Sequence, residues 1–156
     1  MLITRRSQPE DWESIRSVHV ASVTGIQTAL YTAEEIRAWA VPKQPEDYQE
    51  SIRRKEFFVA EDDGIIIGFA VLNQEKAEVE AVYVSPQAGR RGIGLELLRK
   101  LEERAAVLGL GVLTLNASLN AVPFYEKAGY VAQQQSKYRL TTGVVIACVP
   151  MVKLIS

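Results

Sequence analysis

The middle of the chain constrains the fold more than any other part. Residues Ala77–Val84 (AEVEAVYV) indicate a β-strand, and Gly111–Ala117 (GVLTLNA) indicates a second, buried strand. Between them, a turn with three glycines leads into a helical pattern over Gly94–Leu108, whose apolar side chains recur on one face. The order strand, helix, strand predicts a βαβ crossover, which joins two parallel strands of one sheet.

Helices and antiparallel strands are predicted on both sides of this unit. Capping boxes at Ser7/Glu10 and Thr32/Glu35 indicate the starts of two N-terminal helices. The pair Asp63-Gly64 indicates a tight hairpin turn. This pattern predicts an α+β fold with a mixed, mostly antiparallel central sheet flanked by helices, in a single domain over residues 1–156. The further expected elements are strands at Met1–Arg5, Phe57–Glu61, Ile65–Leu72, Tyr130–Leu140 and Val144–Leu154, and helices at Pro45–Arg54 and Asn120–Ala128.

Charge and composition exclude several classes of protein. The net charge is −1, so the chain offers no attractive field to nucleic acid or to an anionic membrane. No apolar run is long enough for a membrane span, and the N-terminus does not resemble a signal peptide. The single cysteine, Cys148, cannot form an internal disulfide, and we expect a cytoplasmic protein. No group of His, Cys and Asp residues has the spacing of a metal site, so no metal is expected.

The glycine turn before the central helix has the chemistry of an anion site. The first amides of a helix lack partners within the helix, and the helix dipole adds positive charge there. Gly89, Gly92 and Gly94 leave these amides accessible, and Arg90 and Arg91 are strong phosphate donors. The spacing matches neither the P-loop of nucleotide triphosphatases nor the dinucleotide-binding Gly-x-Gly-x-x-Gly motif. From this turn alone, a phosphate site and a sharp corner with exposed arginines both remain open.

Two blocks of sequence together resemble a known family. The block VYVSPQAGRRGIGLELLRKLEERA resembles the acetyl-CoA signature of the GNAT superfamily of N-acetyltransferases. The block LTLNASLNAVPFYEKAGY (Leu113–Tyr130) resembles the family's next strand and its Ala-x-x-Phe-Tyr helix. The resemblance covers nearly the whole chain and implies the acyl-CoA N-acyltransferase fold, with acetyl-CoA as co-substrate. Where the family has Arg or Gln, this chain has Gly89, which loses a side-chain contact but keeps its amide.

The resemblance also implies which residues hold acetyl-CoA. The strand before the turn is expected to part from its neighbour near Val82–Val84, so that its free backbone groups bind the pantetheine arm. The amides of the turn are expected to hold the pyrophosphate. The residue that begins the helix at Asn120–Ala128 either contacts the cofactor or caps the helix. The expected cofactor-binding residues are Val82, Tyr83, Val84, Gly89, Arg90, Arg91, Gly92, Ile93, Gly94 and Asn120.

Three residues are candidates for the chemistry of acyl transfer. An amine with a pKa of about 10.4 is mostly protonated near neutral pH, so a base is useful. Glu78 and Glu80 are two apart on a strand and, without a bulge, project to one face, where one carboxylate would have a raised pKa. We prefer Glu80 as the base. Tyr125 matches the family position whose phenol lies beside the cofactor sulfur and can protonate the leaving thiolate. Salt-bridged or solvated glutamates and a packed tyrosine are the alternatives.

These patterns favour an enzyme. The predicted activity is the transfer of an acetyl group from acetyl-CoA to a primary amine, in a small molecule or a peptide, by direct attack in a ternary complex. A non-catalytic acyl-CoA-binding sensor is the alternative. In the family the N-terminal helices wall the acceptor pocket, which implicates Tyr31, Trp39 and Tyr48, with core packing, the commoner use of such residues, as the alternative. We expect the lone His19 to pack rather than to act in catalysis, and a homodimer through the terminal strands is compatible with the fold.

Overall fold

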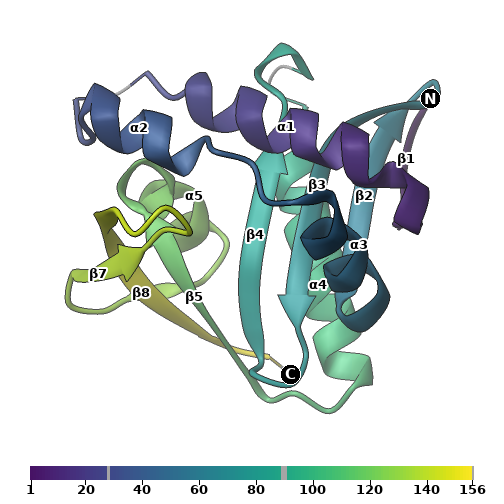
Figure 1. Ribbon diagram of the computed structural model, residues 1–156. Helices are drawn as coiled ribbons and strands as arrows, with labels where there is room; N and C mark the ends of the chain where they lie inside the picture. The colour runs from purple at the N-terminus through teal and green to yellow at the C-terminus, as the bar shows by residue number, and fades with distance from the viewer. Residues whose placement is uncertain (28, 89–90, 156) are drawn as a thin grey trace.

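A central sheet organises the chain. The computed structural model describes residues 1–27, 29–88 and 91–155, so Gly89 and Arg90 of the predicted turn lie outside the described residues. Within the described ranges, one eight-stranded sheet has the order β1-β2-β3-β4-β5-β8-β6, and β7 also pairs with β8 (Figure 1). The strands are β1 (Leu2–Arg6), β2 (Glu56–Asp62), β3 (Ile65–Asn73), β4 (Glu78–Val84), β5 (Val112–Ser118), β6 (Val131–Ala132), β7 (Ser136–Arg139) and β8 (Val145–Leu154).

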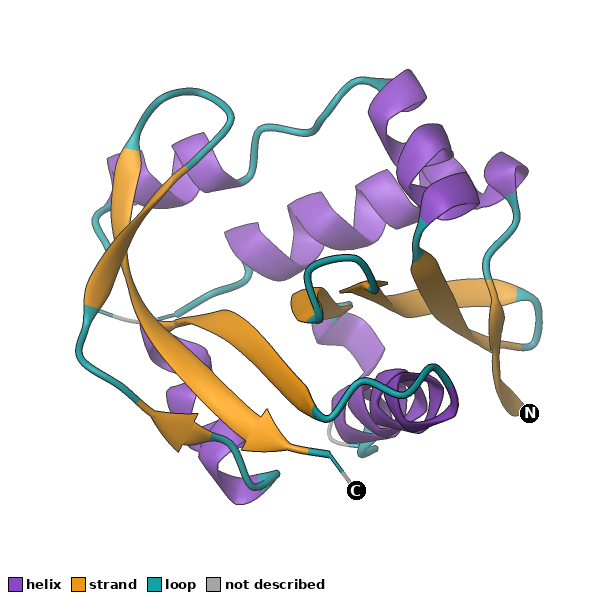
Figure 2. Cartoon of the chain, turned by 90° about the horizontal axis from the view of Figure 1, so that it is seen from below, coloured by secondary structure: helices purple, strands orange, loops and turns teal. Residues whose placement is uncertain are grey.

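The strand pairing confirms the predicted fold class. β4 and β5 are parallel and are joined through the helix α4 (Ile93–Val107), which is the predicted βαβ crossover. The other neighbouring strands of the described chain are antiparallel. The sheet is therefore mixed and mostly antiparallel, and Figure 2 shows it as a layer with helices on both sides.

Each face of the sheet has its own apolar core. On one face, α1 (Trp12–Thr24) and α3 (Pro45–Arg54) pack against β2 and β3, and α2 (Ala33–Trp39) continues this layer. On the other face, α4 contributes fully buried leucines, and α5 (Val122–Lys127) packs beside it. The buried apolar residues of the α4 helix are Ile93, Leu97, Leu98, Leu101 and Ala105. Together these layers hold β4 rigidly between two cores.

The pair of parallel strands stays together for only a short distance. Glu78 pairs with Thr114 and Val79 with Leu115, and beyond these two pairs β4 and β5 separate. On the other side of β4, Ala81 faces Val71 and Val79 faces Leu72, which leaves Glu80 as the extra residue of a β-bulge. The strands therefore part at Glu80, two residues before the predicted point near Val82. The bulge explains the difference, because it bends the strand away from its neighbour.

Several local predictions are confirmed. Thr32 and Glu35 form the capping box of α2, with the Glu35 amide donating to the Thr32 hydroxyl at 3.1 Å. Asp63 and Gly64 both have positive φ, 51° and 83°, as the tight turn between β2 and β3 requires. The helix predicted at Pro45–Arg54 has these bounds in the structure.

Other local predictions are wrong. Ser7 does not cap α1: its hydroxyl is buried and donates to the Phe57 carbonyl at 3.1 Å, and Gln8 with Asp11 forms the capping box instead. The central helix, predicted to run to Leu108, ends at Val107, and the Leu108 side chain is 43% exposed. The strand expected at Tyr130–Leu140 is broken into β6 and β7.

Candidate active site

The N-terminus of α4 lies at the open end of the split between β4 and β5. Gly92 precedes the helix with a left-handed φ of 72°, a conformation that side-chain-bearing residues rarely adopt. The Glu96 amide closes the first helical hydrogen bond to Gly92, so the amides of Ile93 and Gly94 lack helical partners. A side chain at Gly94 would contact Phe124 of α5 and Val84 of β4, at 3.5 and 3.6 Å. The free amides of Ile93 and Gly94 therefore lie beside the end of β4.

The described arginine of the turn makes an ion pair. The Arg91 guanidinium contacts the Asp62 carboxylate at 2.9 Å, on the end of the β2–β3 hairpin. Its side chain is 45% exposed, and exposed pairs of this kind are weak. Arg91 thus points toward the hairpin in this structure rather than across the helix start.

The edge of β4 that faces β5 carries free backbone groups. The Ser85 amide donates to the Ile67 carbonyl of β3 at 2.8 Å. Because hydrogen-bonding direction alternates along an antiparallel strand, the backbone groups of Val82 and Val84 point the other way, into the split. Their side chains pack against the α4 core, and Tyr83 packs against the α1 core.

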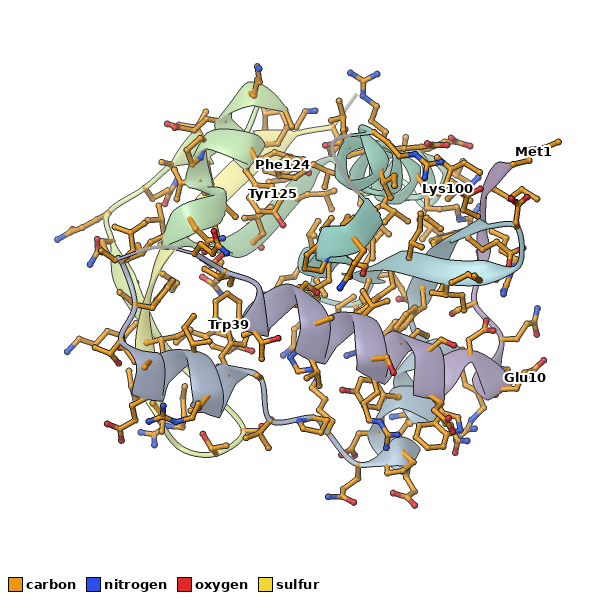
Figure 3. All side chains as sticks on the ribbon, turned by 90° about the horizontal axis from the view of Figure 1, so that it is seen from above. Met1, Glu10, Trp39, Lys100, Phe124 and Tyr125 are labelled. Atoms are coloured by element: carbon orange, nitrogen blue, oxygen red, sulfur yellow. The ribbon has the colours of Figure 1, made fainter. Side chains whose placement is uncertain are left out.

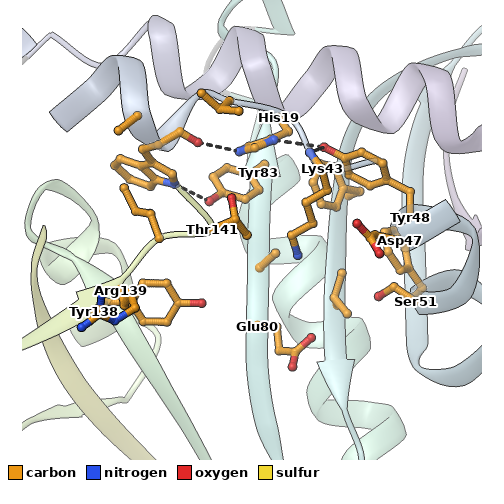
Figure 4. Close-up of a pocket in the computed structure, with 18 residues that line it drawn as sticks. His19, Lys43, Asp47, Tyr48, Ser51, Glu80, Tyr83, Tyr138, Arg139 and Thr141 are labelled. Atoms are coloured by element: carbon orange, nitrogen blue, oxygen red, sulfur yellow. Dashed lines mark hydrogen bonds between the residues drawn. The ribbon is translucent and has the colours of Figure 1, made fainter. Parts of the chain in front are cut away.

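Two adjoining cavities flank β4. The first, which we call the upper cavity, has a volume of about 180 Å³ and lies between β4 and the helices α1 to α3 (Figure 4). The second, the split cavity, has a volume of about 260 Å³ and lies where β4 and β5 part. The two cavities form one cleft, because part of their lining is shared. The residues that line both are Trp39, Lys43, Glu80, Ala81, Tyr83, Tyr138 and Leu140.

The carboxylate of Glu80 lies where the two cavities meet, and it has partners. Lys55 donates to one oxygen at 2.6 Å and Asn73 to the other at 3.0 Å. Burial acts to raise the pKa of Glu80, but these two hydrogen bonds and the Lys55 charge outweigh it, so the pKa is lowered. The expectation of a raised pKa was therefore wrong for Glu80, and the bulge removes the regular spacing on which it rested. Glu78 lines the split cavity as well.

Tyr125 of α5 lines the split cavity from the opposite wall. Its ring makes edge contacts with Phe124 and Tyr130, with centroids 5.0 and 5.8 Å apart, and Figure 3 shows Phe124 and Tyr125 together on α5. Within the described parts of the chain, its hydroxyl makes no hydrogen bond. Burial raises the pKa of Tyr125, so the phenol stays protonated at neutral pH. The Tyr125 ring, held by these contacts, therefore faces the cleft with a protonated hydroxyl that is free to donate.

Aromatic side chains form the roof of the upper cavity. The Trp39 indole donates to the Tyr83 hydroxyl at 3.0 Å, and His19 contacts Trp39 and Tyr48 through its two ring nitrogens (Figure 4). Burial raises the pKa of Tyr83 to about 12 and lowers the pKa of His19. His19 is therefore a neutral, hydrogen-bonded packing residue, as the sequence predicted. Tyr31 instead ties β8 to the loop after β5, through Ala147 and Leu119.

Sequence patterns did not identify several residues of the cleft. Lys55 and Asn73 hold Glu80, Lys43 follows α2, and Tyr138 points into the cleft from β7 (Figure 4). They come from four separate elements, so no spacing in the sequence connects them. Asn120, in contrast, is exposed and lines neither cavity. It lies inside a short 3-10 turn that starts after Ser118, and no cap hydrogen bond is formed there.

The described residues lack a membrane-spanning helix and a metal-binding cluster. No helix there has the length and apolar character needed to cross a bilayer. No group of three or more His, Cys, Asp or Glu side chains there is arranged to hold a metal ion.

Comparisons with known proteins agree with this geometry. Residues 27–155 match the family model described as the acetyltransferase (GNAT) domain. An uncharacterized N-acetyltransferase, YafP of Escherichia coli, is 26% identical over 133 residues, which are 85% of this chain and 83% of that protein. A GCN5-related N-acetyltransferase from Rhodopseudomonas palustris is 29% identical with a TM-score of 0.90, covering 97% and 94% of the two chains.

A second solved structure shares the fold. The PaiA N-acetyltransferase of Thermoplasma acidophilum, solved in complex with coenzyme A, has a TM-score of 0.80, 23% identity and 99% coverage of both chains. The family model spans most of the sequence. This chain belongs to the GNAT family of acetyltransferases.

Proposed function

We propose that the protein transfers an acetyl group from acetyl-CoA to a primary amine by direct attack in a ternary complex. The observation that carries this proposal is the continuous cleft along β4. Its lining includes Val82 on the unpaired edge, Glu80 and Tyr125, and the free amides of Ile93 and Gly94 lie beyond that lining, where Gly94 approaches Val84 of β4. A long thioester cofactor and a separate acceptor fit such a cleft from its two sides.

The acetyl-CoA would lie in the split. The amides at the start of α4 suit the pyrophosphate, because they combine free donors with the positive end of the helix dipole. The backbone of Val82 and Val84 suits the amides of pantetheine, in the manner of an added strand. The structure of the same fold from Thermoplasma acidophilum was solved in complex with coenzyme A, which supports the choice of cofactor. Gly89 and Arg90 belong to this proposal by sequence alone.

The reaction needs three proton transfers. The acceptor arrives as an ammonium, and the ionised Glu80 attracts it and takes up one proton. The neutral nitrogen attacks the thioester carbonyl, a C–N bond forms, and the C–S bond breaks. Tyr125 gives its proton to the departing thiolate, whose acid has a pKa of about 8.5. The nitrogen then loses its second proton, which restores the Tyr125 phenol, and Glu80 releases the first proton to solvent. Glu78 adds negative charge beside the split cavity.

The test is the release of coenzyme A thiol from acetyl-CoA across a panel of amines. We expect release that depends on the amine, with formation of the acetylated product. The sensor alternative predicts stabilisation by acetyl-CoA without any release. Thermal stabilisation combined with no turnover for any amine class would therefore contradict the transferase proposal and favour the sensor.

A further inference from the structure

Lys43 is a cation in the cleft that the reaction above does not use. It lies between α2 and α3 and lines both the upper cavity and the split cavity. Figure 4 shows its ammonium group reaching into the upper cavity, between His19 and Glu80. Across the residues that the structure describes, no carboxylate lies within ion-pairing distance of this ammonium group.

The charge of Lys43 acts on both walls of the cavity. It helps to lower the pKa of His19, after the larger effect of burial. Burial raises the pKa of Glu80, whereas the hydrogen bonds from Lys55 and Asn73, followed by the charges of Lys55 and Lys43, lower it. Lys43 and Glu80 form no ion pair among the described residues, and the groups on the two Glu80 oxygens are Lys55 at 2.6 Å and Asn73 at 3.0 Å.

None of the other charged groups of the upper cavity forms an ion pair with Lys43 within the described parts of the chain. The Asp47 carboxylate accepts a hydrogen bond from the backbone amide of Gln44 at the start of α3. Arg139, a second cation on the cavity wall, contacts only the Gly143 carbonyl, at 3.5 Å, among the described residues. An occupant that displaced water from Lys43 without supplying an anion would leave a desolvated charge against aromatic walls, which is unfavourable.

We propose that the acceptor carries a carboxylate that Lys43 binds, while its amine lies beside Glu80. The substrate class is then a small zwitterion of the amino-acid type, with an apolar side chain toward Trp39 and Leu140. Negative charge from Glu78 and Glu80 and positive charge from Lys43 line the same cleft and match the two charged groups of such a molecule. The proposal rests on the transferase function above and specifies its acceptor.

The kinetic test compares matched pairs of acceptors. L-leucine, L-methionine and L-phenylalanine are assayed against their carboxamides at saturating acetyl-CoA. The wild type should have the higher kcat/KM for the acids, although the amines of the amides are more often neutral and therefore intrinsically more reactive. Lys43→Gln should lower kcat/KM for the acids by about tenfold, mainly through KM, and leave the amides little changed.

Two variants control this comparison. Lys43→Arg keeps the charge and should keep the preference for acids. Lys127→Gln removes an exposed lysine of α5 outside both cavities and should behave as the wild type. Equal use of acids and amides by the wild type, or a preference that survives in Lys43→Gln, would overturn the proposal.

A binding measurement separates this proposal from the transferase function. N-acetyl-L-leucine and its carboxamide are titrated by calorimetry into the protein with coenzyme A present. The acid should bind more tightly, and Lys43→Gln should remove the difference. If no amine is acetylated, the transferase function fails and this result decides the carboxylate site alone. Equal affinities, or no binding of either compound, would overturn it.

Discussion

Tyr125→Phe is expected to slow acetyl transfer by about a hundredfold while leaving the binding of acetyl-CoA intact. The change removes only the hydroxyl, whose proton is unused among the described residues and faces the split cavity. The ring contacts with Phe124 and Tyr130 remain, so the cleft keeps its shape. Steady-state rates and the acetyl-CoA-induced shift of the unfolding midpoint measure the two effects separately.

Tyr130→Phe is the matched control for this variant. Tyr130 is buried beside Tyr125, but its hydroxyl donates to Glu102 at 2.8 Å, away from the cleft. Its loss should change stability slightly and turnover hardly at all. Unchanged turnover in Tyr125→Phe would show that another group protonates the thiolate and that the tyrosine only packs.

Glu80→Gln is expected to lower kcat/KM near neutral pH by about a hundredfold, because the variant can neither attract the ammonium nor accept its proton. The pKa of Glu80 is lowered, so the wild-type carboxylate is ionised throughout the neutral range. As the pH rises toward the pKa of the acceptor, more amine is already neutral, and the deficit of the variant should shrink. Rates measured across this pH range test the role of Glu80 as a base.

Two further glutamate variants sharpen the test. Glu50→Gln removes an exposed carboxylate of α3 that pairs only with Arg54 among the described residues, and it should leave the rate unchanged. Glu78→Gln should cause a smaller loss than Glu80→Gln. A larger loss from Glu78→Gln, or a deficit of Glu80→Gln that stays constant with pH, would reassign the base.

The parts of the fold that could be predicted have local signals. The capping box of Thr32 and Glu35 and the turn at Asp63-Gly64 each depend on a few adjacent residues, and both have the predicted geometry. The crossover from β4 to β5 followed from a change of periodicity, from two to about 3.6 residues, which local sequence records. The two GNAT-like blocks then placed the glycine turn and Tyr125 within one family fold.

The parts that could not be predicted depend on contacts between distant elements. Ser7 does not form the expected helix cap, because its hydroxyl donates a hydrogen bond to the carbonyl of Phe57, 50 residues away in the sequence. The bulge at Glu80 depends on the register between β3 and β4, and its ion pair depends on the end of α3 lying beside that bulge. The cation at Lys43 faces the cleft because the loop between α2 and α3 passes across β4.

The central claim is that backbone amides at the start of α4 hold the diphosphate of acetyl-CoA and that its arm lies along β4. The most direct measurement is the midpoint of thermal unfolding with millimolar acetyl-CoA, compared with S-acetylpantetheine, which lacks the diphosphate. We predict a rise of several degrees with acetyl-CoA and little change with the shorter thioester, because a ligand that binds only the folded state stabilises it. No rise with acetyl-CoA, or equal rises with both compounds, would contradict the claim.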